Sequence, residues 1–204
     1  KASHQLKEGL QSLLGIASNH TGIQYDLASM YIGTVHSICN RLIGDRRFYE
    51  GRRRNEPVKT IDQLEQYFFL KRKRIWQQLL IAGGIEEIDI NAFFQKSKPK
   101  YPNKHKALSE CIKLFNRFSE ERLDIEQALQ DTNENETLQK LIKMYREYRN
   151  ILKTDGPAEL CDLSLIQEKA LEVIEQYDDS STIFKHVIVD EYQDTNFIQE
   201  QLYF

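Results

Sequence analysis

The sequence predicts a mainly α-helical protein with α/β portions at its two ends. Apolar residues recur at helical spacing through most of the 204 residues. Near the C-terminus the pattern changes to an unbroken Val-Ile-Val run at residues 187–189, which is typical of a strand buried on both faces of a parallel sheet. The N-terminal α/β portion is expected from a motif at residues 32–43.

Composition indicates a globular protein. Hydrophobic residues make up 40% of the chain and charged residues 29%, which is ordinary for a folded domain. No apolar run approaches the about 20 residues of a membrane span, and no secretory signal pattern is present. The three cysteines form no CxxC pair, so we expect reduced, buried thiols in a cytoplasmic protein without a membrane partner.

Charge is divided unevenly along the chain. Residues 41–106 contain 16 Lys and Arg against 8 Asp and Glu, whereas residues 107–204 contain 10 against 21. This asymmetry favours an anionic partner on one side of the molecule.

Start and stop signals divide the first half of the helical region. Thr60 and Gln63 resemble a capping box at the start of a helical segment that ends at Gly83 and Gly84. The apolar residues expected to face the core along this segment include Leu64, Phe68, Ile75 and Leu79. Asp89 is expected to open a short helix that ends before Pro99.

The second half follows the same logic. A long apolar stripe covers residues 108–129 and is interrupted near Asp124, and a further helix is predicted over residues 138–151. Asp162 is expected to cap the last helix of this region. Residues 178–182 are predicted to form a polar turn leading into the C-terminal strand.

An acidic pair directly follows that strand. The run DEYQDTN occupies residues 190–196. In open α/β sheets, ligands bind just beyond the carboxyl ends of the strands. An acidic pair at that place suits a Mg²⁺-nucleotide enzyme, in which one carboxylate serves the metal and the other the attacking water. The alternative is a solvated acidic turn.

The run at residues 190–196 resembles the Walker B element of superfamily 1 DNA helicases of the UvrD/Rep/PcrA type. Residues 32–43, IGTVHSICNRLI, resemble the single-strand contact motif of the same family, with Val35 where Phe is common. Residues 1–3 resemble the end of the preceding family motif, and residues 162–163 resemble the Asp-Phe element that closes the helical insertion, with Leu for Phe. Because the order and spacing fit, the resemblance covers nearly the whole chain.

The resemblance implies an architecture and an activity. Residues 1–44 and 183–204 are expected to be remnants of a RecA-like α/β P-loop domain, with strands near residues 31–35 and 183–189, and residues 45–182 a helical insertion domain. The intact protein is expected to couple Mg-ATP hydrolysis to translocation on single-stranded DNA and to duplex unwinding, from 3′ to 5′. ATP and Mg²⁺ are the implied cofactors, and single-stranded DNA and its junctions with duplex are the implied partners.

The resemblance also implies roles for the acidic run. Asp190 is expected to bind Mg²⁺ through water, and Glu191 to act as the catalytic base toward the attacking water. Gln193 is expected to belong to the nucleotide-binding residues together with Asp190 and Glu191, and Gln193 and Asp194 are expected to couple the nucleotide site to neighbouring motifs. A turn-capping role is the alternative for Asp194 or Thr195.

Thr34 and His36 are the implied strand contacts, because a hydroxyl and an imidazole can donate to a DNA phosphate and the ring can stack on a base. The alternative is a helix cap with a satisfied histidine. Ser37 is expected to be the N-cap of the next helix, and Arg41 an ion-pair partner.

Basic clusters interleaved with aromatic residues form the third group of candidates. The loop residues Arg52, Arg53 and Arg54, together with Lys98 and Lys100, are expected to contact DNA phosphates. A second basic cluster lies at residues 71–74. Solvated faces are the alternative for these clusters, and Trp76 is expected to lie in the core.

The sequence contains no GxxxxGK[ST] phosphate-binding loop. We therefore expect a fragment of such a helicase, inactive as an ATPase by itself. Two other interpretations stay open: a catalytically inactive helicase-like module for nucleic-acid binding or protein interaction, and a nuclease-linked recombination helicase of the AddA/RecB kind, whose strand-contact motif also tolerates an aliphatic residue before His36.

Overall fold

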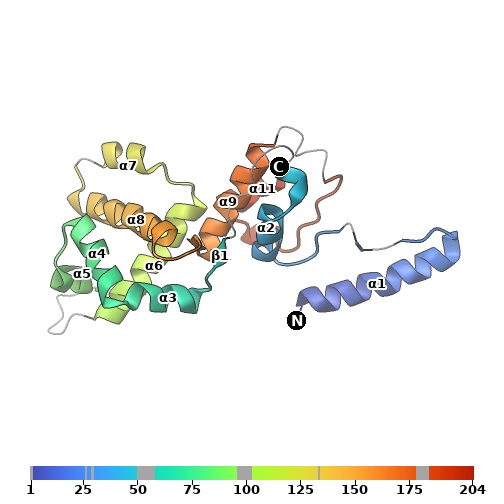
Figure 1. Cartoon of the computed structure of the whole chain (residues 1–204), viewed down its shortest axis with the longest axis horizontal. Coiled ribbons are helices and arrows are strands. Elements are labelled where there is room, and N and C mark those ends of the chain that lie inside the picture. Colours follow the sequence, from blue (N-terminus) through green and yellow to red (C-terminus); the bar gives the residue numbers. More distant parts are fainter. Residues whose placement is uncertain are drawn as a thin grey trace.

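The computed structural model describes residues 2–25, 27–28, 30–49, 58–95, 103–132, 134–177 and 184–204. Within them the chain is mainly helical, as predicted (Figure 1). A helical region lies at one end of the molecule, and the first helix, α1 (Ala2–Thr21), extends away at the other. Between the two lie α2 (Val35–Ile43), the short 3-10 helix η1 (Arg46–Tyr49) and the C-terminal residues.

The helical region begins and ends at a small parallel sheet. Strand β1 (Lys59–Thr60) pairs with β2 (Leu160–Cys161), with Lys59 opposite Leu160. The Ile61 amide donates to the Cys161 carbonyl at 2.8 Å and extends the pairing by one residue. The two strands therefore hold together the ends of a segment of about one hundred residues, so the helices that follow each strand start side by side.

The first predicted helical segment divides into α3 (Gln63–Lys71) and α4 (Lys73–Gly83). The capping box uses Asp62 and Glu65 rather than Thr60 and Gln63, because Thr60 belongs to β1 and Asp62 directly precedes the first residue of α3. The break at Arg72 also changes the phase of the helix.

That change of phase decides which residues are buried. Ile75 and Leu79 are fully buried as predicted, whereas Leu64 and Phe68 keep 64% and 55% of their surface exposed. The prediction that Leu64 and Phe68 face the core is therefore wrong. The buried residues of α3 and those of α4 therefore do not form one continuous stripe along the two helices.

The two glycines that end α4 have different roles. A Cβ on Gly83 would lie 2.7 Å from Met144 Cγ, so the glycine permits the close approach of α4 to α8 (Glu136–Thr154). Gly84 has φ 61° and ends the helix in the left-handed conformation. After it, α5 (Glu87–Phe93) begins two residues before the predicted Asp89, with Glu86 in extended conformation at the N-cap.

The remaining helices follow the prediction closely. Asp124 caps α7 (Ile125–Asp131) and separates it from α6 (Lys104–Glu120). The helix α9 (Leu163–Glu175) begins after Asp162, whose Oδ1 accepts hydrogen bonds from the Ser164 and Leu165 amides. The predicted interruption near Asp124 and the predicted cap at Asp162 are confirmed.

A buried polar network lies between these helices. Asp162 Oδ2 accepts hydrogen bonds from Tyr148 Oη at 2.6 Å and from Gln66 Nε2 at 3.2 Å, and Gln66 Nε2 also reaches Asn116 Oδ1 at 2.8 Å. Burial raises the pKa of Asp162 despite the hydrogen bonds from Tyr148 and the backbone that act to lower it. The network joins α3, α6, α8 and the start of α9 in one hydrogen-bonded unit.

The apolar core continues beyond the helical region. Cys39, Leu42 and Ile43 of α2 belong to the same buried cluster as residues of α9, and Phe48 meets Tyr177 edge-on. The C-terminal helix α11 (Phe197–Tyr203) also packs on α9, with Ile198 fully buried. Helix α9 therefore supports segments from both ends of the chain.

The strands predicted near residues 31–35 and 183–189 are not present among the described residues. Residue 183 lies outside the description, Val35 is the first residue of α2, and residues 184–189 are irregular. Val187 and Ile188 are 56% and 96% exposed. A buried strand needs neighbouring strands for its backbone groups, and the described residues place none beside this segment.

Two expectations about the chain as a whole can be compared with the structure. The three cysteines, Cys39, Cys111 and Cys161, are free and buried, as predicted. None of the helices in the described part of the chain is both long and apolar enough to cross a membrane.

Candidate functional site

The acidic run forms an exposed turn. Asp190 and Glu191 precede the 3-10 helix η2 (Tyr192–Asp194), and both carboxylates are exposed. The Glu191 amide donates to Asp190 Oδ1 at 3.0 Å, and Gln193 Nε2 donates to Glu191 Oε2. The three residues predicted to bind the nucleotide complex are thus connected to each other by hydrogen bonds.

Glu191 has an unusual backbone conformation. Its φ of 52° and ψ of 42° lie in the left-handed region, which costs a residue with a Cβ about 1–2 kcal/mol. Among the described residues other than glycine, only Arg122 shares a positive φ, and Arg122 follows the end of α6, where helices commonly adopt it. Glu191 follows no helix, so its strain belongs to the acidic turn itself.

The turn is attached to the molecule through α11. Asn196 caps this helix in a capping box with Gln199, and Tyr192 Oη donates to Glu200 Oε1 at 3.3 Å. The cap is therefore Asn196, and neither Asp194 nor Thr195 fills that place. The burial of Ile198 fixes α11 on α9 and so fixes where the turn lies.

The donors at this turn fit hydrated Mg²⁺ rather than a tightly chelated metal. In the part of the chain that the structure describes, no three His, Cys, Asp or Glu side chains are placed to hold a metal ion. Mg²⁺ usually keeps several waters and uses one or two carboxylates together with substrate phosphates. Asp190 and Glu191 are oxygen donors of that kind, but the sequence supplies no glycine-rich loop for the phosphates.

Thr34 begins the second candidate segment as the N-cap of α2. Its Oγ1 accepts a hydrogen bond from the Ser37 amide at 3.4 Å, and Ser37 Oγ donates to the Thr34 carbonyl at 2.8 Å. A Cβ on Gly33 would lie 2.3 Å from Ser37 Oγ, so a larger residue there would displace the Ser37 hydroxyl from its hydrogen bond. The prediction that Ser37 is the cap is wrong, because Thr34 has the extended backbone and Ser37 already lies inside the helix.

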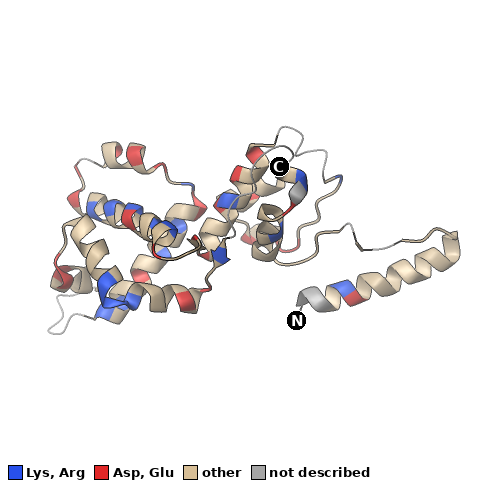
Figure 2. Ribbon diagram, in the orientation of Figure 1, with Lys and Arg blue, Asp and Glu red and all other residues tan. Residues whose placement is uncertain are grey.

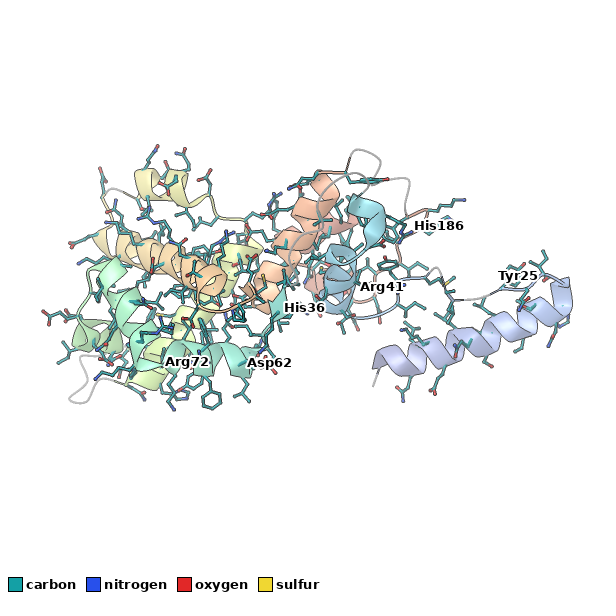
Figure 3. All side chains as sticks on the ribbon, in the orientation of Figure 1. Tyr25, His36, Arg41, Asp62, Arg72 and His186 are labelled. Carbon is teal, nitrogen blue, oxygen red and sulfur yellow. The ribbon has the colours of Figure 1, made fainter. Side chains whose placement is uncertain are left out.

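His36 lies where α2 meets α9 (Figure 3). Its Nε2 is 3.2 Å from Nε2 of Gln167, a buried residue of α9. Burial lowers the pKa of His36, and the Glu120 carboxylate of α6 opposes that shift. The ring is half-buried, so it is neither fully enclosed nor fully free.

A cluster of aromatic and arginine side chains joins residues 31–47 to Phe184. Tyr31 meets Phe184 edge-on at 5.2 Å between ring centroids, and the Arg41 guanidinium lies 3.9 Å from the Tyr31 centroid. Arg41 also donates to the Met30 carbonyl at 3.1 Å. Arg41 was predicted to take part in an ion pair. Among the described residues its guanidinium lies over the Tyr31 ring instead.

Asp45 and Arg47 complete this cluster. Arg47 Nη2 pairs with Asp45 Oδ2 at 2.7 Å and also donates to Tyr31 Oη at 2.9 Å. Burial acts to raise the pKa of Asp45, but the hydrogen bonds from Arg47 outweigh it and lower the pKa. The contacts of Tyr31, Asp45 and Arg47 therefore hold one side of the motif at residues 32–43 in place. No feature of the sequence predicted these contacts.

The structure describes the basic cluster at residues 71–74. The predicted contacts Arg52, Arg53, Arg54, Lys98 and Lys100 lie outside the described residues. Basic side chains gather at the junction of α3 and α4 (Figure 2), where Lys71 lies 5.7 Å from the Phe68 ring centroid and Arg72 and Arg74 pair with Asp155. Trp76 has no exposed surface, which confirms its assignment to the core.

The two candidate segments share one support. Helix α2, with Thr34 and His36, packs on α9, and α11, which follows the acidic turn, packs on α9 as well. Sequence reasoning identified both segments but not their connection. Gln167 was missed because the apolar residues of α9 were sufficient to predict that helix. In addition, its partner His36 lies 131 positions away in the sequence.

Comparison with known proteins gives a consistent result. All 204 residues match the UvrD/REP helicase N-terminal domain family. Among curated proteins, the chain is similar to DNA helicase II of Haemophilus influenzae, with 28% identity over 204 residues that cover 98% of this chain and 23% of the relative. The chain thus spans about a quarter of the length of that relative. No solved structure matches it.

Proposed function

Since the chain belongs to the UvrD/REP helicase N-terminal domain family, we propose that the protein that carries it is an ATP-dependent DNA helicase. In this proposal ATP and Mg²⁺ are the cofactors, and the protein translocates 3′ to 5′ on single-stranded DNA and unwinds it from duplex at junctions. The observation that carries the proposal is the family match over residues 1–204, because that range includes both the acidic turn and the motif at residues 32–43.

The acidic turn contributes carboxylates with separate tasks. Asp190 holds the hydrated cation through water, because Mg²⁺ dehydrates reluctantly. When bound, Mg-ATP supplies the γ-phosphoryl group that is transferred to water. Glu191 orients the attacking water and takes its proton on the carboxylate.

Gln193 keeps the Glu191 carboxylate in place. Its Nε2 donates to Glu191 Oε2, which leaves Oε1 as the oxygen that receives the proton. The left-handed backbone at Glu191 supports this assignment, since strained residues gather at sites where the surrounding structure must hold a side chain in one orientation.

The N-terminus of α2 contacts single-stranded DNA. Thr34 offers a hydroxyl at the start of the helix and His36 an imidazole two residues later, and both groups donate to phosphate. Arg52, Arg53, Arg54, Lys98 and Lys100 add phosphate contacts that carry no sequence preference.

Replacement of Glu191 by Gln in the full-length protein tests the catalytic assignment. We expect DNA-stimulated ATP turnover to fall about 100-fold, the lower range for loss of a general base, while ATP binding measured by a fluorescent nucleotide analogue stays unchanged. The matched control is Glu200→Gln, a neighbouring exposed glutamate on α11 that accepts only the Tyr192 hydroxyl.

A rate for Glu191→Gln within about threefold of wild type, far from the loss typical of a missing general base, would show that Glu191 is not the base. Absence of DNA-stimulated turnover in the unmodified full-length protein would instead favour an inactive helicase-like module.

A further inference from the structure

The contact between Gln167 and His36 defines which atoms are donors. Gln167 Nε2 lies 3.0 Å from the Leu163 carbonyl and 3.2 Å from His36 Nε2. A carbonyl oxygen only accepts, so the group facing Leu163 must be the amide NH₂. Its two hydrogens then point to the Leu163 carbonyl and to His36, and the reverse orientation of the amide would place two oxygens against each other.

This assignment determines the state of the imidazole. If Gln167 donates, His36 Nε2 must accept, and a ring nitrogen accepts only when it carries no proton. The proton of the neutral ring is then on Nδ1. A protonated His36 would turn its Nε2–H toward the amide N–H, so the contact favours the neutral ring.

The surroundings agree with that state. Gln167 is only 1% exposed and His36 is half-buried, which disfavours charge on the ring. The acidic group that faces the ring is Glu120 of α6, and its carboxylate already accepts a hydrogen bond from Ser164 Oγ at 2.8 Å. The lowered pKa of His36 follows the burial and not the carboxylate.

The side chain of Gln167 contains an energetically unfavourable buried oxygen. Gln167 Oε1 is buried and has no hydrogen-bond partner among the described residues. An apolar side chain would avoid the unpaired oxygen, so packing alone does not account for an amide here. The NH₂ end, in contrast, is fully used by Leu163 and His36.

We propose that Gln167 is a positioning residue for the strand-contact motif: it holds His36 as the neutral Nδ1–H tautomer, so that Nδ1–H is the group that His36 offers to a DNA phosphate. The inference rests on the proposed DNA contact of His36. It gives α9, the last helix of the helical region, direct control over the donor in the motif at residues 32–43, because the state of the ring depends on where α9 places one amide.

The first test reads the tautomer directly. In the ¹⁵N-labelled full chain near pH 7, long-range ¹H–¹⁵N spectra should show His36 with a protonated Nδ1 and an unprotonated Nε2. Gln167→Met, which keeps the length of the side chain but removes the amide, should shift the ring toward a mixture of tautomers. The matched control is Gln66→Met, because Gln66 is equally buried and its amide serves the network around Asp162 without contacting His36.

An Nε2–H tautomer in the wild-type chain would overturn the inference, and so would ring signals that Gln167→Met leaves unchanged. If Gln167→Met prevents folding, Gln167→Leu is the second variant: it also places no polar atom against the Leu163 carbonyl or His36, so it should shift the ring toward the same mixture of tautomers.

The second test separates this inference from the DNA contact itself. Gln167→Met should weaken binding of a fluorescent oligo-dT to the full-length protein about fivefold, the loss expected for one hydrogen bond, and should have no further effect when His36 is already Ala. If His36→Ala does not change binding although the spectra show the Nδ1–H tautomer, then the tautomer assignment holds and the DNA contact of His36 is refuted.

Discussion

At the scale of single residues, the backbone conformation of Glu191 does not stabilise the fold. A glutamate at φ 52° gains nothing in stability from its Cβ, since the left-handed region disfavours it. Its carboxylate is exposed and, among the described residues, accepts a hydrogen bond from Gln193 of the same turn. The conformation therefore orients the side chain at the expense of local stability.

Replacement of Glu191 by Gly should therefore not destabilise the fold. We expect the free energy of unfolding to stay the same or to rise by up to about 1 kcal/mol, because relief of backbone strain offsets the greater freedom of glycine in the unfolded chain. Urea denaturation of the full chain measures it. The control Glu200→Gly places glycine inside α11 and should lower the free energy by about 1 kcal/mol; equal losses in the two variants would contradict strain at Glu191.

At the scale of helices and strands, Asp162 has more contacts than an ordinary cap. It caps α9 with one oxygen and anchors Tyr148 and Gln66 with the other. Its removal leaves the buried Tyr148 hydroxyl without its acceptor and takes one of its acceptors from Gln66. The free energy involved is therefore larger than that of a surface cap.

We expect Asp162→Ala to lower the free energy of unfolding by about 2–4 kcal/mol, the sum of a lost cap and an unsatisfied buried donor. The pKa of Asp162 is raised from 3.8 in the fold, so the folded state binds its proton more readily than the unfolded chain. The contribution of Asp162 therefore increases as pH falls from neutral toward 3.8, and the loss in the variant should be larger near pH 4 than at pH 7.

Urea denaturation at both pH values measures this difference. The control Asp124→Ala removes the exposed cap of α7 and should cost only about 1 kcal/mol. A loss in Asp162→Ala that shrinks toward pH 4 would contradict the direction of the pKa shift.

Sequence patterns predicted the helices better than the strands, and the reason is physical. Helical hydrogen bonds and caps are local, so apolar spacing and residues such as Asp124 and Asp162 are sufficient to place helices. A strand needs a partner that the pattern of residues 187–189 does not contain. The capping box at Asp62 was misplaced by two residues because a short strand occupies Thr60.

The candidate site divides in the same way. The acidic turn and the residues Thr34 and His36 were predicted because each motif is contiguous in the sequence. Gln167 and the contact of Tyr31 with Phe184 could not be predicted, because each depends on packing between segments far apart in the chain.

At the scale of the whole molecule, charge is the property that bears on DNA binding. The basic excess lies within residues 41–106 and the acidic excess after residue 106. Basic segments attract a nucleic acid, and acidic segments oppose its approach.

The full chain should bind single-stranded DNA weakly, with a log–log salt slope of about −0.7 for each phosphate neutralised. Four or five engaged cations give a slope of about −3. Replacement of Arg52, Arg53 and Arg54 by Ala should reduce its magnitude by about 2, as measured by fluorescence anisotropy from low to moderate salt.

The matched control for this change replaces three cations of the acidic half, Lys113, Arg117 and Lys140. These three cations form ion pairs with nearby glutamates. Replacing them changes the net charge by the same amount as the triple arginine variant, but the salt slope should stay unchanged. An equal effect of both triple variants would show that the slope reports net charge alone and that the arginine loop makes no contact.

The packing of α2 and α11 on α9 has a mechanical consequence. A helix of 13 residues is about 20 Å long and behaves as a stiff rod. Because α2 and α11 both pack on this rod, the position of α9 bears on the helix that carries His36 and on the helix that follows the acidic turn. A displacement of α9 therefore reaches both candidate segments through packing that is already in place.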